Sequence, residues 1–140
     1  MEKRNMNSQD YPLATKSPQF IKTPTGKKLE DITLEQVING EIKPEDVRIS
    51  RETLEMQAQI AESMNRDAVA RNFRRASELI AVPDERLLVI YNCLRPYRST
   101  KEELLVIAEE LENIYNAKVN ARFVREAAEV YEQRGKLRQE

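Results

Sequence analysis

From residue 33 onward, apolar positions recur every three to four residues, the spacing of one face of an α-helix. This pattern predicts helices over about 50–64, 66–80, 83–94, 99–115 and 120–135, with a shorter helix over 33–40. No segment shows the alternation of a half-buried strand, and no internal repeat is visible. The pattern therefore predicts an all-α fold, a compact bundle of about five to six helices.

Capping and turn residues place several of the helix boundaries. Ser50 is suited to cap the helix that follows it, and Asn120 is expected to cap the last one. Pro96 should end the preceding helix. Ser99 and Glu102 have the spacing of a capping box, so the next helix is expected to begin there.

The helix predicted over 83–94 is the most apolar of the set. Its run of apolar residues is too continuous for one stripe, which favours a helix buried on several sides. We expect it to form the centre of the core. The main stripe is Leu87, Ile90, Tyr91 and Leu94, and Leu88 and Val89 lie outside it.

Residues 1–30 show no helical period and are expected to form an extended, proline-containing arm. Pro12, Pro18 and Pro24 each push the preceding residue toward extended geometry. Tyr11 and Phe20 give this arm apolar anchors, which favours an arm ordered on another surface over a frayed tail. The expected organisation is an arm over 1–30 and a helical domain over 31–140.

The composition limits the classes of function. Apolar residues make up 40% and charged residues 34% of the 140 residues, so the core is thin. Such a chain suits a helical unit that completes its burial against a partner, or an ordinary helical domain. The 23 basic and 24 acidic residues nearly cancel, which argues against nucleic acid and membrane surfaces as partners. No apolar stretch is long enough to span a membrane and the N-terminus is polar, so we expect a cytoplasmic protein.

Most catalytic chemistry is excluded by residue type. The chain has no histidine, one cysteine and three glycines, which removes the commonest general base, the usual metal clusters and a phosphate-binding loop. Cys93 is expected to be a small buried hydrophobe. Glu109, Glu110 and Glu112 are interpreted as a solvated face. We expect no catalytic, cofactor-binding or metal-binding residue on this chain.

A basic run over 66–75 allows three interpretations: a nucleic-acid helix, a solvated face, or a patch that faces a partner protein. The near-neutral charge disfavours the first, and Glu78 is positioned to pair with Arg74. We favour the partner patch, with Arg71 and Arg75 as candidate interface residues.

The turn over 94–100 holds two arginines and a tyrosine within four residues. Turn formation does not require Arg95, Tyr97 or Arg98, but protein interfaces are enriched in both residue types. The predicted interface set is Tyr11, Phe20, Arg71, Arg75, Arg95, Tyr97 and Arg98.

Six segments resemble one known family, in order along the chain. They are YPLA at 11–14, DVRIS at 46–50, RNF at 71–73, AVPDER at 81–86, LRPYRSTKEELL at 94–105 and FVRE at 123–126. In these segments the chain resembles the small subunit of the adenosylcobalamin-dependent glycerol and diol dehydratases, and the resemblance covers the chain from about Tyr11 to its C-terminus.

The resemblance implies a noncatalytic subunit of a lyase with two copies each of large, medium and small subunits. Such an enzyme converts glycerol to 3-hydroxypropanal, or propane-1,2-diol to propanal, with loss of water. The radical chemistry is implied to belong to the large, barrel-forming subunit, and the adenosylcobalamin to lie between the large and medium subunits. The small subunit is then expected to brace the large one.

Only ten residues precede Tyr11, whereas some diol dehydratase small subunits carry a longer extension linked to bacterial microcompartments. We therefore expect the glycerol dehydratase branch, with enclosure in a microcompartment left open. The alternative from another class is a stand-alone helical adaptor or regulator.

Overall fold

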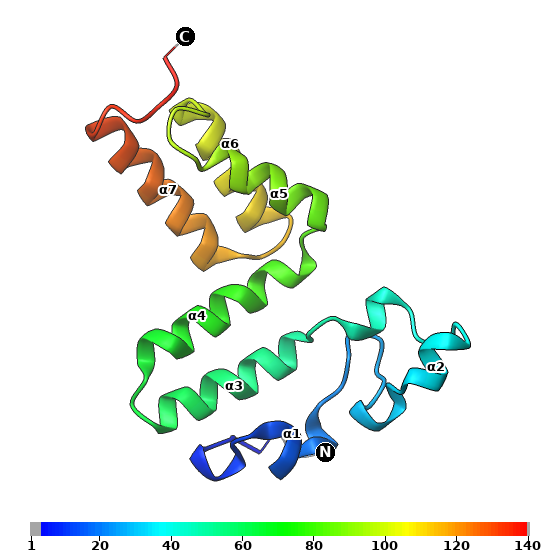
Figure 1. Ribbon diagram of the computed structural model, residues 1–140. Coiled ribbons are helices and arrows are strands. Elements are labelled where there is room, and N and C mark those ends of the chain that lie inside the picture. Colours follow the sequence, from blue (N-terminus) through cyan, green and yellow to red (C-terminus); the bar gives the residue numbers. More distant parts are fainter. Residues whose placement is uncertain (1–3, 140) are drawn as a thin grey trace. The chain divides into compact units, whose positions relative to one another are not determined.

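The computed structural model describes residues 4–139 and contains seven α-helices within them (Figure 1). No strand occurs in this part of the chain, where one isolated bridge pairs Lys22 with Lys28. The all-α prediction is confirmed. The helices are α1 (Leu13–Lys16), α2 (Leu34–Ile38), α3 (Arg51–Ser63), α4 (Asp67–Glu78), α5 (Asp84–Cys93), α6 (Lys101–Asn113) and α7 (Lys118–Gln133).

The described residues divide into two units, one ending at Ser77 and the other beginning at Glu78. The first unit contains the N-terminal segment together with α1, α2, α3 and nearly all of α4. The second contains α5, α6 and α7. The arm predicted over 1–30 falls within the first unit. Its division from a helical domain over 31–140 stays a prediction.

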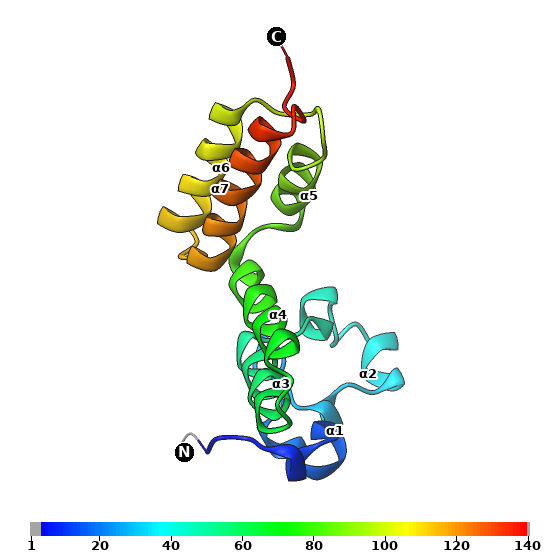
Figure 2. The ribbon, with the colours of Figure 1, turned by 90° about the vertical axis from the view of Figure 1, so that its left-hand side faces the viewer.

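Helix α3 organises the first unit because it carries two apolar stripes. One stripe includes Ala58 and Ala61, which are buried with Ala70 of α4. The other includes Ile60, which is buried with Met6 and Leu13 from the N-terminal segment. Ser50 caps α3 as predicted, since its side chain accepts a hydrogen bond from the Thr53 amide. In both views α3 and α4 lie side by side (Figures 1 and 2).

The N-terminal segment is less extended than the sequence suggested. It contains α1 and two 3-10 turns, Ser8–Asp10 and Pro18–Phe20, and Pro12 and Pro18 stand at the starts of helical turns. Buried Asp10 accepts hydrogen bonds from the Ser17 hydroxyl and the Asn7 amide, both at 3.0 Å. Tyr11, which precedes Pro12, is extended as expected, but helical turns begin directly after Pro12 and at Pro18.

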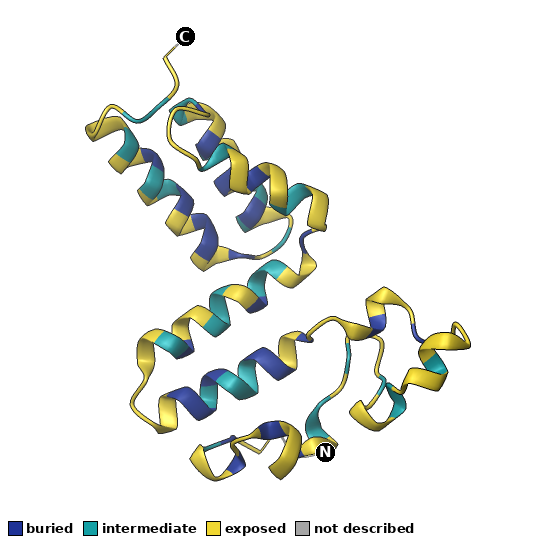
Figure 3. Ribbon diagram, in the orientation of Figure 1, coloured by how far each residue is buried: buried dark blue, intermediate teal, exposed yellow. Residues whose placement is uncertain are grey.

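The core of the second unit lies between α6 and α7. Leu104 and Leu111 of α6 and Val124 of α7 are its largest fully buried side chains. Helix α5 adds Ile90 but exposes Leu88. Most of the rest of this helix is also exposed, as the yellow parts of its ribbon show (Figure 3). The expectation that the helix over 83–94 is the centre of the core is wrong. One of its sides covers the α6–α7 pair, and the other is uncovered in this chain.

Two expected helix starts also differ from the structure. Helix α6 begins one residue later than expected, with Thr100 as its cap and Glu103 as the partner in the capping box. The Ser99 hydroxyl instead donates a hydrogen bond of 2.8 Å to the Cys93 carbonyl. Asn120 lies inside α7 rather than at its cap.

The amides at the start of α7 are capped by Glu78. Its carboxylate accepts hydrogen bonds from the Val119 and Asn120 amides at 3.2 and 3.0 Å, and from the Asn120 side chain at 2.7 Å. The prediction that Glu78 pairs with Arg74 is therefore wrong. Arg74 instead bridges α4 to Glu55 and Glu62 of α3.

Candidate protein interface

The turn between α5 and α6 has an unusual residue at its most restrictive position. The Arg98 amide donates to the Arg95 carbonyl at 3.3 Å, which closes a turn with Pro96 in its second position. Tyr97 occupies the third position with a φ of 65°. Turns that combine proline with a positive φ at the next residue favour glycine there, because side chains disfavour this left-handed conformation. The backbone conformation at Tyr97 therefore favours glycine, and the tyrosine side chain is accommodated there at a cost in backbone energy.

The C-terminal tail holds this turn in place. The Tyr97 amide donates to the Lys136 carbonyl at 2.7 Å, and the Arg138 amide donates to the Ser99 carbonyl at 2.9 Å. The Arg138 guanidinium donates to the Arg98 carbonyl at 3.0 Å. We call residues 136–138 the tail clasp. Its bonds fix the backbone on both sides of Tyr97.

A carboxylate of α6 completes the tail clasp. Glu103 accepts a hydrogen bond of 2.7 Å from the Arg138 guanidinium and one of 3.0 Å from the Thr100 amide. These two bonds, that of Arg138 first, lower the pKa of the Glu103 carboxyl below its ordinary value. Glu103 stays ionised at neutral pH and joins the tail to the start of α6.

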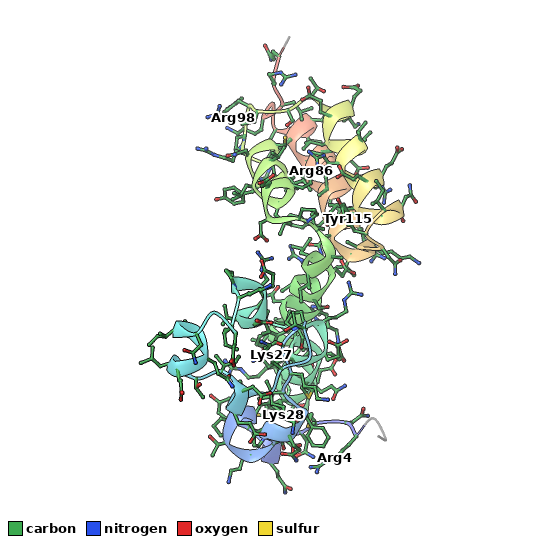
Figure 4. The ribbon with its side chains drawn as sticks, turned by 90° about the vertical axis from the view of Figure 1, so that its right-hand side faces the viewer. Arg4, Lys27, Lys28, Arg86, Arg98 and Tyr115 are labelled. Atoms are coloured by element: carbon green, nitrogen blue, oxygen red, sulfur yellow. The ribbon has the colours of Figure 1, made fainter. Side chains whose placement is uncertain are left out.

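The clasped turn presents its side chains to solvent. Tyr97 is 55% exposed, and Arg95 and Arg98 are also exposed. Figure 4 shows Arg98 at the end of the second unit from which the C-terminus emerges. The structure thus brings these three predicted residues together on one rigid, exposed turn.

An apolar surface on α5 leads into this turn. Leu88 and Tyr91 are three residues apart, hence on one side of the helix, and are 65% and 69% exposed. Both were expected in or near the core, so sequence reasoning missed them as interface candidates. For Leu88 the sequence did contain one sign of exposure, because this residue lies outside the main apolar stripe of the helix. Exposed aromatic, aliphatic and arginine side chains together make the composition of a protein interface.

The other predicted residues lie in the first unit. Tyr11 is exposed at the rim of an apolar hollow of about 530 Å³ that Leu13, Ile60 and Phe73 also line. Phe20 is partly buried against the cluster of Met6, Leu13 and Ile60, so it supports the segment from within. Arg71 is exposed and Arg75 is partly buried on α4. These four residues belong to a different unit from the turn, and two of them, Tyr11 and Arg71, are exposed.

The acidic residues of α6 have structural partners. Glu110 accepts hydrogen bonds from Arg86 of α5, and Glu112 pairs with Arg125 of α7. The bond from Arg86 is the main reason that the pKa of Glu110 is lowered. The interpretation of 109–112 as a wholly solvated face is therefore wrong at two of its three carboxylates, which join α6 to both neighbouring helices.

The absence of catalytic residues stays a prediction for this chain. Within 4–139, no three aspartate, glutamate or cysteine side chains gather in a way that could hold a metal ion. Cys93 is half-buried. None of the helices in this range is long and apolar enough to cross a membrane. The exposed Tyr97 turn and the uncovered side of α5 have a composition suited to contact with another protein.

Comparison with known proteins agrees with a subunit role. Residues 6–138 match the family model described as dehydratase small subunit. The propanediol dehydratase small subunit of Salmonella typhimurium is 57% identical over 135 residues, covering 96% of this chain and 78% of that protein. The propanediol dehydratase small subunit of Citrobacter freundii is 57% identical over 129 residues, covering 92% and 75%.

Proposed function

Because the chain belongs to the dehydratase small-subunit family, we propose that it braces the large, catalytic subunit of a diol-dehydrating lyase and takes no part in the bond-breaking steps. The complex would contain large, medium and small subunits in two copies each. Its substrates would be short vicinal diols: propane-1,2-diol, as the names of the relatives suggest, or glycerol. We place the complex in the cytoplasm, with or without a surrounding microcompartment.

One observation carries this proposal: Tyr97 is exposed in a backbone conformation that favours glycine, and the tail clasp holds it there. A conformation of this kind costs on the order of 1 kcal/mol, and persists where surrounding contacts over-determine it. A rigid aromatic beside two arginines is a typical interface anchor, since it loses little entropy on binding. We therefore assign Tyr97, Arg95 and Arg98 to the contact with the large subunit.

Adenosylcobalamin, when bound by the complex, would supply the radical that starts the reaction, and we assign its site to the other subunits. The residues of this chain do not fit the cofactor well. The lining of the 530 Å³ hollow is apolar apart from Tyr11, Thr53, Gln57 and Arg66, whereas cobalamin carries many amide groups that need polar partners. The chain's contribution to turnover would be indirect, through the geometry of the subunit that it supports.

The direct test is coexpression of the large and medium subunits with and without this chain. Aldehyde formation from propane-1,2-diol and from glycerol is then measured with added adenosylcobalamin. We expect activity and an intact complex only when all three chains are present. Full activity without this chain would contradict the bracing role.

The anchor is tested with Tyr97→Gly, which removes the side chain and also relaxes the backbone. The isolated variant should be as stable as the wild type within about 1 kcal/mol, because the relaxed backbone offsets the lost side-chain contacts. Its dissociation constant for the large subunit should nevertheless rise at least tenfold, as expected for the loss of an aromatic anchor.

Asn116→Gly is the matched control. Asn116 also has a positive φ, 53°, and lies in the exposed connection between α6 and α7, away from the turn. This variant should leave complex formation unchanged. Equal binding by the Tyr97→Gly and Asn116→Gly variants would remove the anchor role from Tyr97.

A further inference from the structure

A second exposed apolar surface lies on α2, in the first unit. Leu34 and Ile38 are 75% and 74% exposed, Val37 is also exposed, and none of the five residues of α2 is buried. Figures 1 and 2 both show α2 standing apart from α3 and α4, and Figure 3 shows it largely exposed. A surface helix that presents its apolar residues outward gains no stability from them in this chain.

Local bonds shape α2 without burying it. The Thr33 hydroxyl accepts from the Gln36 amide at 3.3 Å, and Gly40, with a φ of 77°, reverses the chain after the helix. The Glu41 and Ile42 amides then donate to the Gln36 carbonyl at 2.9 and 3.3 Å. A single helical turn is only marginally stable by itself in water. The hydrogen bonds at both ends of α2 therefore stabilise its conformation while its apolar side chains stay exposed.

The base of this segment is anchored through buried Asp46. Its carboxylate accepts hydrogen bonds from the Thr25 hydroxyl at 2.5 Å and from the Lys43 amide at 2.8 Å. The Lys27 ammonium lies 3.3 Å from the same carboxylate and donates to the Glu41 carbonyl at 2.6 Å. The segment thus has a fixed base and an uncovered apolar tip.

The charge around the tip has one dominant sign. Residues 29–45 contain five acidic residues and one lysine, and Lys28, directly before them, lies 3.5 Å from the Glu30 carboxylate. Four of the acidic residues are exposed: Glu30, Glu35, Glu41 and Glu45. An apolar tip flanked along the chain by exposed carboxylates complements an apolar depression with lysine or arginine at its rim. A second copy of the same segment would bring like charges together, which disfavours self-association through this tip.

We infer that residues 29–45, which we call the acidic finger, insert the Leu34 and Ile38 side chains into a basic-rimmed apolar depression on the large subunit. This inference rests on the proposed function, since it assigns a second contact to the same partner. The acidic finger and the Tyr97 turn belong to different units of the chain and act as separate attachments.

The test is the double variant Leu34→Ala/Ile38→Ala, assayed for binding to the large and medium subunits. Both side chains are already exposed, so the isolated variant should keep the wild-type circular dichroism spectrum. Its dissociation constant should rise at least tenfold, since two aliphatic side chains would no longer be buried on binding. Val106→Ala/Ile114→Ala is the matched control, because it truncates two exposed aliphatic side chains of the second unit and should change binding less than threefold.

Charge is tested separately with Glu35→Lys/Glu41→Lys. This variant should bind at least tenfold more weakly at low salt, and the difference from the wild type should shrink as salt is added. Binding by either finger variant equal to that of the wild type overturns the inference, as does an equal loss in the control. A wild-type dimer that the Leu34→Ala/Ile38→Ala variant abolishes would also overturn it, because the occupant would then be a second copy. Failure of the wild type itself to bind would contradict the proposed function instead.

Discussion

The backbone amide of Tyr97 donates a hydrogen bond of 2.7 Å to the carbonyl of Lys136, and the ammonium of Lys136 donates one of 2.9 Å to the Tyr97 hydroxyl. The same ammonium lies 5.1 Å from the centre of the Tyr97 ring, within cation–π range. The conformation of an exposed turn is thus coupled to a tail nearly forty residues further along the chain.

Truncation of the chain after Gly135 should loosen the turn without unfolding α7. The truncation removes the carbonyl acceptor of the Tyr97 amide and the bonds made by Arg138, at a cost of about 1–2 kcal/mol for partly exposed groups. The expected result is hydrogen exchange at the Tyr97 amide at least tenfold faster than in the full chain. Lys136→Ala is the control, since it keeps the carbonyl and should leave that exchange rate nearly unchanged.

Glu78→Ala should destabilise the start of α7. The variant removes the acceptor of the Val119 and Asn120 amides, and loss of a helix cap costs about 1 kcal/mol. Urea denaturation would measure the loss, with faster exchange of these two amides as the local sign. Glu109→Ala, at an exposed position of α6, should change stability by less than about 0.5 kcal/mol. Equal effects of the two variants would show that Glu78 does not act as the cap.

Leu111→Ala and Leu88→Ala should differ sharply, although both remove the same atoms. Leu111 is 1% exposed between α6 and α7, so its truncation should cost about 2–5 kcal/mol of unfolding free energy. Leu88 lies on the uncovered side of α5, and its truncation should cost less than about 0.5 kcal/mol in the isolated chain. Thermal denaturation of both variants checks this difference. A large loss of stability in Leu88→Ala would show that Leu88 is buried and that α5 belongs to the centre of the core.

Asp46 makes the stability of the acidic finger depend on pH. Hydrogen bonds from the Lys43 amide and then from the Thr25 hydroxyl lower the pKa of Asp46 from 3.8 to about 2. Because the folded pKa is the lower one, the stabilisation is complete above about pH 4 and is lost as the pH falls through about 2. Melting temperatures measured from pH 7 to pH 2 should therefore fall less steeply for Asp46→Asn than for the wild type.

The Asp46→Asn variant needs two checks. At pH 7 it should melt below the wild type, since an amide cannot replace an ionised carboxylate beside Lys27. Glu109→Gln, which removes an exposed carboxylate from α6, should follow the wild-type pH profile closely. Parallel curves for Asp46→Asn and the wild type would exclude Asp46 as the source of the acid sensitivity.

Sequence predicted the helices well because their stripes are long and their breaks are marked by proline, glycine or capping residues. The start of α6 shows where local reasoning fails. Ser99 and Thr100 are each followed by glutamate three residues later, so the sequence allows two capping boxes. The bond from the Ser99 hydroxyl to the Cys93 carbonyl belongs to the folded turn and leaves Thr100 to cap the helix.

The other wrong predictions involve contacts between residues that are distant in sequence. Glu78 has an arginine one turn before it, but its bonds are to amides more than forty residues away. In α5 the continuous apolar run gave no sign of which side would be covered, because that depends on how many helices pack around it. For the candidate interface, sequence composition singled out the Tyr97 turn, whereas Leu88, Tyr91 and the acidic finger emerged only from their exposure.

The uncovered side of α5 also bears on how a cell must make this chain. Molecules produced in surplus would present Leu88 and Tyr91 to chaperones and proteases, which recognise such patches on unassembled proteins. Orphaned copies would therefore be short-lived. Coordinated synthesis with the companion chains would limit the degradation of unassembled copies.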